Sequence, residues 1–418
     1  MKILRLTIVI AALAGLGPAP AQVLPRVQLP QLPTPEVRLP AEPVRAVTGT
    51  LATLPHAARA DQLYRDHRAE LDRDNRGELV IRAEVVAIDI TDDALAKAKK
   101  AGFDVRRTQE LADLGVKVTV LQTPEGMSAT RGLKKLRKLD PAGTYDYNHV
   151  YLDSGGTLVA AATGAQSDAP LPNADAPRRR IGLIDGGVDP AHEALARDAV
   201  HSSGCGGKLV PNAHGLAVAS VLAAHAPLEI YAADVYCGSP TGGAVDAVAA
   251  AFGWLARERV AVINVSLVGP RNALLERIVA SLVQRGFVIV AAVGNDGPAA
   301  PPLYPASYDG VVGVTAVDRE RKVLIEAGRG AQVDFAARGA DLDGATQAPA
   351  GWGPIRGTSF AAPVVAALLA QQLDAPDAAA RERALADLAA SATDLGKRGR
   401  DDVYGAGLVG MEAAAPAK

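Results

Sequence analysis

The chain has 418 residues, of which 49% are hydrophobic and only 4% aromatic. Ala, Val and Leu must therefore build the core, which suits α/β packing of small side chains, and the length allows two or three domains. Lys and Arg total 44 against 46 Asp and Glu. This near balance argues against nucleic-acid binding, which usually requires a basic face.

The N-terminus has the pattern of an export signal. Lys2 and Arg5 precede a short apolar run from Leu6 to Leu16, and Ala19-Pro20-Ala21 fits a cleavage site with small residues. The run is too short for a comfortable membrane span, and no later stretch is long enough. We therefore predict a signal peptide over residues 1–21, a periplasmic or extracellular bacterial protein, and no membrane span after signal removal. An uncleaved N-terminal anchor is the alternative.

The chain contains two cysteines, Cys205 and Cys237, which are too few for a zinc framework. Export places them in an oxidising compartment, so we predict a disulfide between them. If the export prediction is wrong, two reduced and unrelated thiols are the better expectation.

The N-terminal half predicts two linkers and one small domain. Residues 22–77 are rich in Pro and then in charge, which indicates a linker without its own core, with a partly helical stretch near its end. Residues 78–152 follow the order β-α-β-β-α-β, with Thr91 and Ser128 as helix caps, which predicts a small α+β, ferredoxin-like domain. Residues 153–177 indicate a second linker. Alone, the small domain resembles a binding or chaperoning module, because it holds no cluster of catalytic groups.

Residues 178–412 alternate strand and helix patterns, which predicts a doubly wound, mostly parallel sheet with helices on both faces. Asp185 and Asn295 follow predicted strands, whereas His214 and Ser359 begin predicted helices. Ligands of such sheets bind beyond the carboxyl ends of the strands, so all four side chains can converge on one edge. Three consecutive arginines, residues 178–180, directly precede the first predicted strand of this half. They are either a site of proteolytic processing or the solvent-exposed start of that strand.

These four residues have complementary chemistry. A serine hydroxyl is a weak nucleophile that needs a neighbouring base, and a neutral imidazole near pH 7 supplies one. A carboxylate that binds the other ring nitrogen holds the required tautomer, and Asn295 is an uncharged donor for a developing oxyanion. Each residue alone is more often a cap, a turn former or a structural histidine. Their joint occurrence on one predicted sheet favours catalysis.

Four motifs together resemble the subtilisin-like serine proteases, also called subtilases or the peptidase S8 family. They are residues 181–188, 214–219, 294–297 and 357–363, and the order Asp, His, Ser is that of the family. The resemblance covers about residues 178–412. It implies a subtilisin-like fold and a serine endopeptidase that hydrolyses polypeptides through an acyl-enzyme intermediate.

The resemblance also implies residue roles. Ser359 is the expected nucleophile, His214 the general base and acid, and Asp185 the orienting carboxylate. The Asn295 side chain and the Ser359 backbone N–H are expected to form the oxyanion hole. Substrate-binding positions are expected at Ser266, Leu267, Val268 and Gly294.

By the same resemblance, residues 78–152 correspond to an inhibitory propeptide that assists folding. Residues 148–151 correspond to its last strand, which would occupy the substrate cleft, with self-cleavage soon after Tyr151. The expected partners are polypeptide substrates and the chain's own propeptide, with no nucleic acid, and we expect a monomer. Calcium is common in the family, but the sequence identifies no ligands, so no metal or other cofactor is assigned.

Three positions depart from the family pattern. Gly186 and Leu216 stand where the family usually has hydroxyl residues, which we expect to loosen hydrogen bonding around the triad. Val268 stands where the family usually has Gly and should narrow the S1 entrance, which favours small or slender P1 residues. The first two changes keep open a catalytically weak or inactive subtilase-like binding protein. Another α/β hydrolase is disfavoured, because the chain contains no Gly-x-Ser-x-Gly.

Overall fold

The computed structural model describes residues 55–155, 157–158, 178–225, 227–239, 242–347 and 351–411. The predicted signal peptide and most of both predicted linkers lie outside these residues. All described residues belong to one compact unit, which begins at Val47. Within the described ranges, no helix combines the length and the apolar character that a bilayer crossing requires.

The C-terminal domain, residues 178–411, is organised around a parallel sheet of seven strands. Across the sheet the order is β15, β14, β13, β11, β8, β10 and β9. The predicted mostly parallel α/β fold is therefore confirmed. In chain order the strands are Arg179–Asp185 (β8), Ala199–Ser203 (β9), Leu228–Asp234 (β10), Val262–Val265 (β11), Val288–Ala292 (β13), Val312–Val317 (β14) and Phe335–Arg338 (β15).

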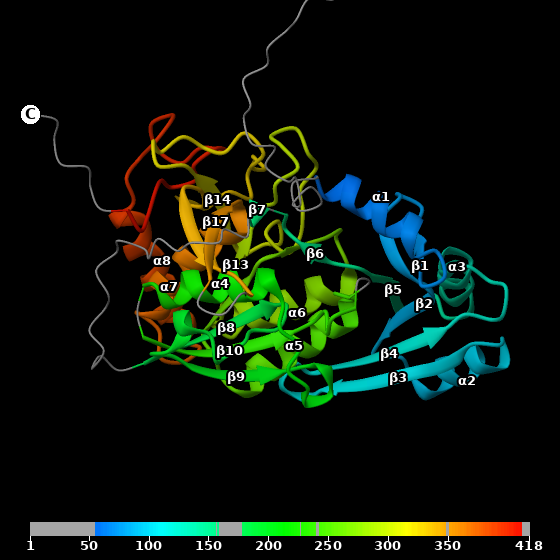
Figure 1. Ribbon diagram of the computed structural model, residues 1–418. Helices are drawn as coiled ribbons and strands as arrows, with labels where there is room; N and C mark the ends of the chain where they lie inside the picture. The colour runs from blue at the N-terminus through cyan, green and yellow to red at the C-terminus, as the bar shows by residue number, and fades with distance from the viewer. Residues whose placement is uncertain are drawn as a thin grey trace, which may run out of the picture. The chain divides into compact units, whose positions relative to one another are not determined.

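Helices cover both faces of this sheet (Figure 1). One face packs against α4 (Ala213–Ala223), α7 (Thr358–Ala370) and α8 (Ala378–Ser391). The other face packs against α5 (Val245–Arg257) and α6 (Ala273–Gln284). Almost every residue of α4 and α7 is buried, and most are Ala or Val, so these two helices lie close to the sheet. The starts of α4 and α7 are thereby held rigidly at the edge where the strands end.

The N-terminal domain is a five-stranded antiparallel sheet with two helices. Its strands are Leu71–Arg73 (β1), Leu79–Ile88 (β2), Asp104–Leu111 (β3), Val116–Gln122 (β4) and Thr144–His149 (β5). The helices are Asp92–Lys100 (α2) and Ala129–Leu139 (α3), and the side chains of Thr91 and Ser128 cap them as expected. Central β2 pairs with β1, β4 and β5, and β4 pairs with β3, which gives the split βαβ arrangement.

Alternating side chains of β2 serve two different cores. Val85 and Ala87 pack against α2 and α3 inside the N-terminal domain. Val86 and Ile88 point to the opposite face and belong to the apolar cluster that includes α5 and α6. Because strand side chains alternate, one strand can join both domains, and the second face of the N-terminal sheet is buried against the C-terminal domain.

Several short elements connect or extend the two domains. Helix α1 (His56–Asp66) lies in the partly helical stretch expected near the end of the first linker, whereas strand β1 lies where the sequence indicates only a linker. β1 was missed because it is three residues long and flanked by charges. The remaining short elements are η1 (Ala112–Leu114), β6 (Leu152–Asp153), β7 (Thr157–Leu158), η2 (Glu193–Leu195), η3 (Cys205–Gly207), β12 (Leu267–Val268), β16 (Leu342–Ala345) and β17 (Trp352–Arg356).

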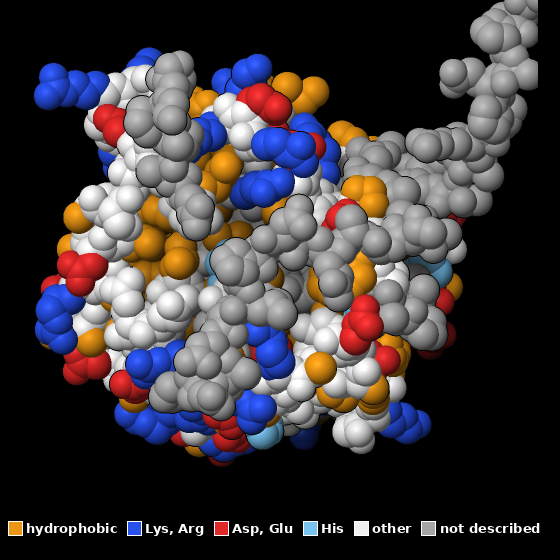
Figure 2. Space-filling view, turned by 60° about the vertical axis from the view of Figure 1, so that its left-hand side comes forward, with side chains coloured by type: hydrophobic (Ala, Val, Ile, Leu, Met, Phe, Trp, Pro, Cys, Tyr) orange, Lys and Arg blue, Asp and Glu red, His pale blue; other side chains and the backbone are white. Residues whose placement is uncertain are grey.

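Charged side chains of both signs are interspersed over the molecular face drawn in Figure 2. Lys and Arg side chains lie next to Asp and Glu side chains among the described residues that this view shows.

Candidate active site

Ser359 lies in the first turn of α7, which follows Gly357. Gly357 has a φ of 141°, a conformation that residues with a side chain rarely adopt. Pro363 lacks an N–H, so the Ser359 carbonyl has no partner inside the helix. The Ser266 hydroxyl donates to that carbonyl at 3.0 Å instead. The segment that follows β11 therefore anchors the turn that carries Ser359, which is fully buried.

Asp185 and His214 form a hydrogen-bonded pair. Asp185 is the last residue of β8 and is fully buried, and His214 is the second residue of α4. The two carboxylate oxygens of Asp185 lie 2.9 and 3.0 Å from His214 Nδ1. Because a carboxylate only accepts, Nδ1 carries the proton and Nε2 is left as the basic nitrogen. Nε2 is buried and has no hydrogen-bond partner among the described residues.

The surroundings of His214 adjust its basicity. Burial lowers the pKa of His214, but the charge and hydrogen bond of Asp185, together with the charge of Asp153, outweigh that effect. The pKa of His214 is therefore raised above its ordinary value of 6.5. A base with this property takes a proton readily near neutral pH, as general base catalysis requires.

Gly186, the residue after Asp185, is required by packing against Asn212. A Cβ at Gly186 would lie 2.3 Å from the Asn212 side chain. The Asn212 side-chain oxygen accepts from the N–H groups of His214 at 2.9 Å and Gly215 at 3.1 Å, and so caps α4. The Asn212 side chain, which positions His214, therefore occupies the space that a hydroxyl side chain at position 186 would need.

Leu216 is buried and contributes to the apolar core beneath the sheet edge. It also lines a cavity of about 570 Å³. None of the expected substrate-binding residues borders that cavity; its lining is Asp189, Ala191, His192, Glu193, Pro211, Leu216 and Gln347.

Asn295 follows β13, and its side chain is held by the start of α7. The Thr358 N–H donates to Asn295 Oδ1 at 3.0 Å, and the Gly294 N–H donates to Thr358 Oγ1 at 3.2 Å. These bonds direct the Asn295 amide nitrogen away from α7. It donates to the Ser154 carbonyl at 2.8 Å and also contacts the Gly155 carbonyl.

The site is occupied by the chain's own residues 150–155. The Tyr151 N–H donates to the Gly243 carbonyl at 2.8 Å, β6 pairs antiparallel with β12, and the Ser154 N–H donates to the Ser266 carbonyl at 3.0 Å. Further along, β7 pairs antiparallel with β17, which leads directly to Ser359. An extended peptide bound along both sides of a serine is the posture of a protease substrate.

The structure brings the four expected residues to one edge of the sheet. Their hydrogen bonds form two separate groups and do not run in one series from Asp185 to Ser359. Asp185 binds His214, while Ser359 and Asn295 meet at Ser154. The Ser359 hydroxyl contacts the Ser154 hydroxyl and lies 3.4 Å from the Gly155 carbonyl oxygen. The ring of Phe360, the next residue, is centred 5.6 Å from the His214 ring.

The expected substrate-binding residues surround this segment. Backbone groups of Ser266 and β12 pair with residues 152–154, as described above. A Cβ at Gly294 would lie 2.7 Å from the Leu303 side chain and 3.7 Å from that of Val268. Val268 and the buried Leu303 therefore both crowd the space over Gly294.

Three contributors to this arrangement were not identified from the sequence. Thr358 orients Asn295, and its place inside the serine motif was the available signal. Tyr151 ends the segment that is expected to occupy the substrate cleft, but the sequence does not indicate that its whole side chain is buried. Arg59 of α1 binds the carboxylate of Asp153 at 2.7 Å and its carbonyl at 3.0 Å. No sequence signal connects Arg59 with a residue that far away.

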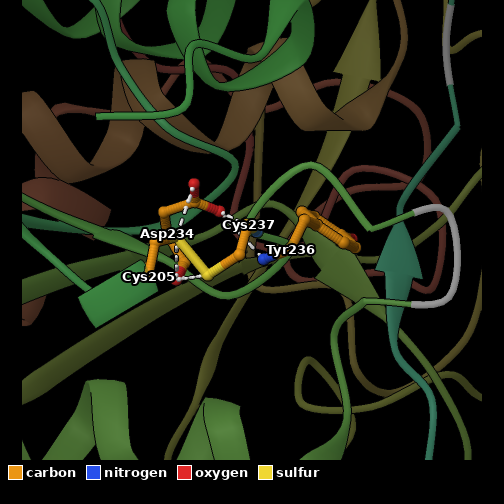
Figure 3. The surroundings of a disulfide bond; sticks show 4 residues. All are labelled: Cys205, Asp234, Tyr236 and Cys237. Atoms are coloured by element: carbon orange, nitrogen blue, oxygen red, sulfur yellow. Dashed lines mark hydrogen bonds between the residues drawn. A yellow bond between two sulfur atoms is a disulfide. The ribbon is translucent and has the colours of Figure 1, made fainter. Parts of the chain in front are cut away.

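Cys205 and Cys237 form a disulfide, as expected from export (Figure 3). It joins η3 to the loop after β10, next to the edge where Asp185 lies. Asp234, at the end of β10, accepts from the N–H groups of Tyr236 and Cys237, both at 2.9 Å (Figure 3). The loop that follows β10 is thus held at its beginning by a covalent bond and by a carboxylate.

Among the described residues, no cluster of His, Cys, Asp and Glu side chains alone supplies the ligands of a calcium ion, which the family commonly binds. The only group there of three or more His, Cys, Asp or Glu side chains near enough to share an ion is Cys205, Asp234 and Cys237. Both sulfurs belong to the disulfide, and calcium requires six to eight oxygen ligands. This group of three side chains is therefore not a calcium site.

Comparisons with known proteins identify the family of the chain. The sequence pattern of the Subtilase family matches residues 179–407. Subtilisin DY of Bacillus licheniformis is 31% identical over 252 residues, which cover 56% of this chain and 90% of subtilisin DY. Subtilisin BL of Lederbergia lenta is 33% identical over 214 residues, which cover 49% and 77% of the two chains.

One solved structure resembles most of this chain in its fold. Fervidolysin from Fervidobacterium pennivorans, a keratinolytic enzyme related to subtilisin, superimposes with a TM-score of 0.65 at 20% identity. The superposition covers 81% of this chain and 62% of fervidolysin. With the family pattern, the subtilisin relatives and this fold together, the chain belongs to the subtilase family and is a serine-type endopeptidase.

Proposed function

We propose that this endopeptidase is exported as a zymogen and first cleaves its own chain after Ser154, with the N-terminal domain as its propeptide. One observation carries the proposal. The Ser154 carbonyl accepts from Asn295 Nδ2 at 2.8 Å while the Ser154 N–H is bound by Ser266 at 3.0 Å, directly beside the Ser359 hydroxyl. A carbonyl held by an oxyanion donor beside a serine is positioned as a substrate for acyl transfer.

The proposed roles are those of a serine protease triad. The Ser359 Oγ–H proton passes to His214 Nε2, and Oγ forms a bond to the Ser154 carbonyl carbon. Asn295 Nδ2 and the Ser359 backbone N–H stabilise the resulting oxyanion. His214 then donates the proton to the Gly155 nitrogen as the C–N bond breaks, and Asp185 stabilises the imidazolium. Water hydrolyses the acyl-enzyme by the same steps with His214 again as the base.

The site favours a small residue on the acyl side of the cleaved bond. Val268 and Leu303 occupy the space over Gly294. The residue whose carbonyl Asn295 holds in the zymogen is Ser154, which has a small side chain. A large aromatic side chain at this position would displace both apolar side chains. We therefore propose a preference for Ser, Ala or Gly at P1 in polypeptide substrates.

Export is supported by the signal-like N-terminus and by the disulfide, since disulfides persist mainly in oxidising compartments. We propose a periplasmic or extracellular monomer. Size-exclusion chromatography of the processed protein tests the monomer, and cell fractionation tests the compartment.

The central test compares the wild-type chain with Ser359→Ala. We expect the wild type to yield a fragment that begins at Gly155, and the variant to remain one chain. Ser391→Ala, at the end of α8, is the matched control and should process normally. A fragment that begins at Gly156 would move the cleaved bond by one residue, to the second carbonyl that Asn295 reaches. A start after Leu158 would contradict the proposal.

A serine-directed fluorophosphonate decides between the enzyme and an inactive binding protein with the same fold. We expect it to label the processed wild type but not Ser359→Ala. Processed protein without labelling would favour the binding protein. Gly186, one of the two positions that suggested this alternative, packs against the Asn212 side chain that caps α4, which supports the enzyme.

A further inference from the structure

Helix α1 contacts the active site, although it precedes the strands of the N-terminal domain in the chain. The His56 N–H, at its start, donates to the carboxylate of Asp296, in the loop that carries the expected oxyanion donor. Three residues later, Arg59 binds Asp153 in the bound segment. Because residues three apart in a helix lie on the same face, one face of α1 reaches both the oxyanion loop and the bound segment.

A single oxygen of Asp153 connects Arg59 with the bond of the proposed self-cleavage. Arg59 Nη1 lies 2.7 Å from Asp153 Oδ1 and donates to the Asp153 carbonyl at 3.0 Å. The same Oδ1 accepts from the Gly155 N–H at 3.1 Å. Gly155 supplies the nitrogen of the Ser154–Gly155 peptide bond, which is the leaving group. Hydrogen bonds therefore connect α1 with the leaving nitrogen.

The packing of α1 holds Arg59 in place. Ala60, the next residue, is buried in an apolar cluster with Leu71 of β1 and Leu152 of the bound segment. The Arg59 side chain is 14% exposed, whereas that of Asp153 is 32% exposed. A planar guanidinium on a packed helix loses little freedom when it binds, so it can fix the position of the more exposed carboxylate.

The orientation of the leaving nitrogen matters for the reaction. When a serine hydroxyl adds to the Ser154 carbonyl carbon, the Gly155 nitrogen loses its amide character and develops the lone pair that takes the proton from His214. A nitrogen whose N–H is already bound keeps one orientation while this lone pair develops. Correct orientation before the reaction lowers the barrier.

We propose that Arg59, acting through Asp153, is a positioning residue for self-cleavage of the Ser154–Gly155 bond. Helix α1 is then a part of the zymogen that aligns its own scissile bond, and it leaves with the N-terminal fragment once that bond is cut. Polypeptides cleaved afterwards are not aligned by Arg59. The proposal rests on the proposed cleavage after Ser154 and adds to it a residue from outside the expected propeptide, residues 78–152.

Arg59 also counters the charge that the bound segment brings to the base. Burial lowers the pKa of His214, whereas the carboxylates of Asp185 on β8 and Asp153 on the bound segment raise it. The charge of Arg59 on α1 acts in the lowering direction. Loss of Arg59 should therefore move the rising limb of the self-cleavage rate profile to higher pH, because cleavage needs neutral His214.

The test follows self-cleavage of refolded full chains on gels, at pH values where the rate no longer depends on pH. We expect Arg59→Ala to be about tenfold slower than wild type, because its leaving nitrogen is less well aligned. Arg59→Lys keeps the charge but not the guanidinium geometry, so its rate should lie between those two. Arg65→Ala, exposed on the same helix, is the matched control and should cleave at the wild-type rate. Equal rates for Arg59→Ala and wild type would overturn the proposal.

A double substitution tests whether Arg59 acts through the Asp153 carboxylate. Asp153→Ala removes the acceptor of the Gly155 N–H and should itself slow self-cleavage. In that background Arg59 keeps only its contact with the Asp153 carbonyl, so adding Arg59→Ala should slow cleavage by about threefold at most. A further tenfold loss would show that Arg59 acts independently of the carboxylate and would contradict the proposal.

Two readouts separate this proposal from the proposed function. N-terminal sequencing and fluorophosphonate labelling of the wild-type product test the cleaved bond and the active site, whatever the effect of Arg59. Hydrogen exchange in the Ser359→Ala chain needs no catalysis. There we expect Arg59→Ala to accelerate exchange of the Gly155 N–H about fivefold or more, while the amides of α6 exchange as before. Unchanged exchange at Gly155 would show that Arg59 does not hold the leaving nitrogen.

Discussion

At the scale of single residues, the zymogen site contains one carboxylate that the processed enzyme would lack. Asp153 lies beside His214 and, together with Asp185, raises the pKa of that histidine. Burial raises the pKa of Asp153, but the charges of Arg59 and His214 hold it below its usual range, so Asp153 is ionised near neutral pH. The bound segment therefore raises the pKa of His214, the base that would take part in its cleavage.

The first prediction concerns the pH dependence of self-cleavage in Asp153→Asn. Cleavage needs neutral His214, so its rate rises as pH increases through the pKa of His214, which lies above 6.5. Removing the charge of Asp153 removes one of the effects that raise this pKa. The rising limb of the rate profile should therefore move to lower pH, as measured by gel time courses during refolding at a series of pH values. Asp93→Asn, on α2, is the control. A limb that stays in place or moves to higher pH would contradict the assignment.

The second prediction concerns the residues over Gly294. Val268→Gly and Leu303→Ala each remove side-chain atoms from this space and should admit larger P1 residues. We expect kcat/KM for a peptide with Phe at P1 to rise about tenfold relative to the matching Ala peptide. The enlarged apolar contact that a Phe side chain gains is worth about 1–3 kcal/mol. Ratios measured on the two peptides within one preparation cancel differences in active enzyme concentration. Unchanged ratios in both variants would show that other residues limit P1.

At the scale of elements, the loop after β10 combines support and recognition. The disulfide and Asp234 hold its start, and Tyr236 and Gly243 in the same loop bind Tyr151. A cross-link at one end of a loop limits the conformations that its binding residues explore. The disulfide thus stabilises the domain and keeps one wall of the cleft in place.

The third prediction is that Cys205→Ser combined with Cys237→Ser lowers stability by about 3–4 kcal/mol, from the chain entropy released over a separation of 32 residues. Urea unfolding of the Ser359→Ala chain, with and without the two substitutions, measures the difference without self-digestion. Reduced Ser359→Ala should unfold at the same urea concentration as the doubly substituted chain. If breaking the bond leaves the midpoint unchanged, the disulfide has no structural role in the folded state.

At the scale of the whole molecule, the sequence predicts the C-terminal domain better than its relation to the N-terminal domain. The parallel sheet is readable because buried strands and helices alternate at regular spacing, and the site residues are readable because each lies in a short local motif. The edge strand β9 is not readable, because its polar residues are largely exposed and only tertiary pairing with β10 makes it a strand. The contact between Arg59 and Asp153 cannot be predicted from the sequence either, because no local pattern encodes a partner 94 residues away. Nor does the alternation in β2 reveal that its two faces serve different domains.

The final prediction concerns the polar network that joins the two domains. Arg107 of β3 donates to both carboxylate oxygens of Glu84, at 3.0 and 2.9 Å, and to Asp246 of α5 at 2.5 Å. Asn148 donates to Glu84 at 2.7 Å. Only Asp246 comes from the C-terminal domain, and it is 3% exposed. Loss of Arg107 would leave two carboxylates close together without their cation, which disfavours the bound state of the N-terminal domain.

We therefore expect Arg107→Ala to hasten release of the cleaved N-terminal domain by about tenfold, an effect of about 1.4 kcal/mol. The measurement is the lag between self-cleavage, followed on gels, and the appearance of peptidase activity. Arg107→Lys retains the charge but not the bidentate geometry, so its lag should fall between those of Arg107→Ala and wild type. Arg131→Ala on α3, away from the interface, should leave the lag unchanged. Equal lags in all four proteins would mean that the Arg107 network does not hold the two domains together.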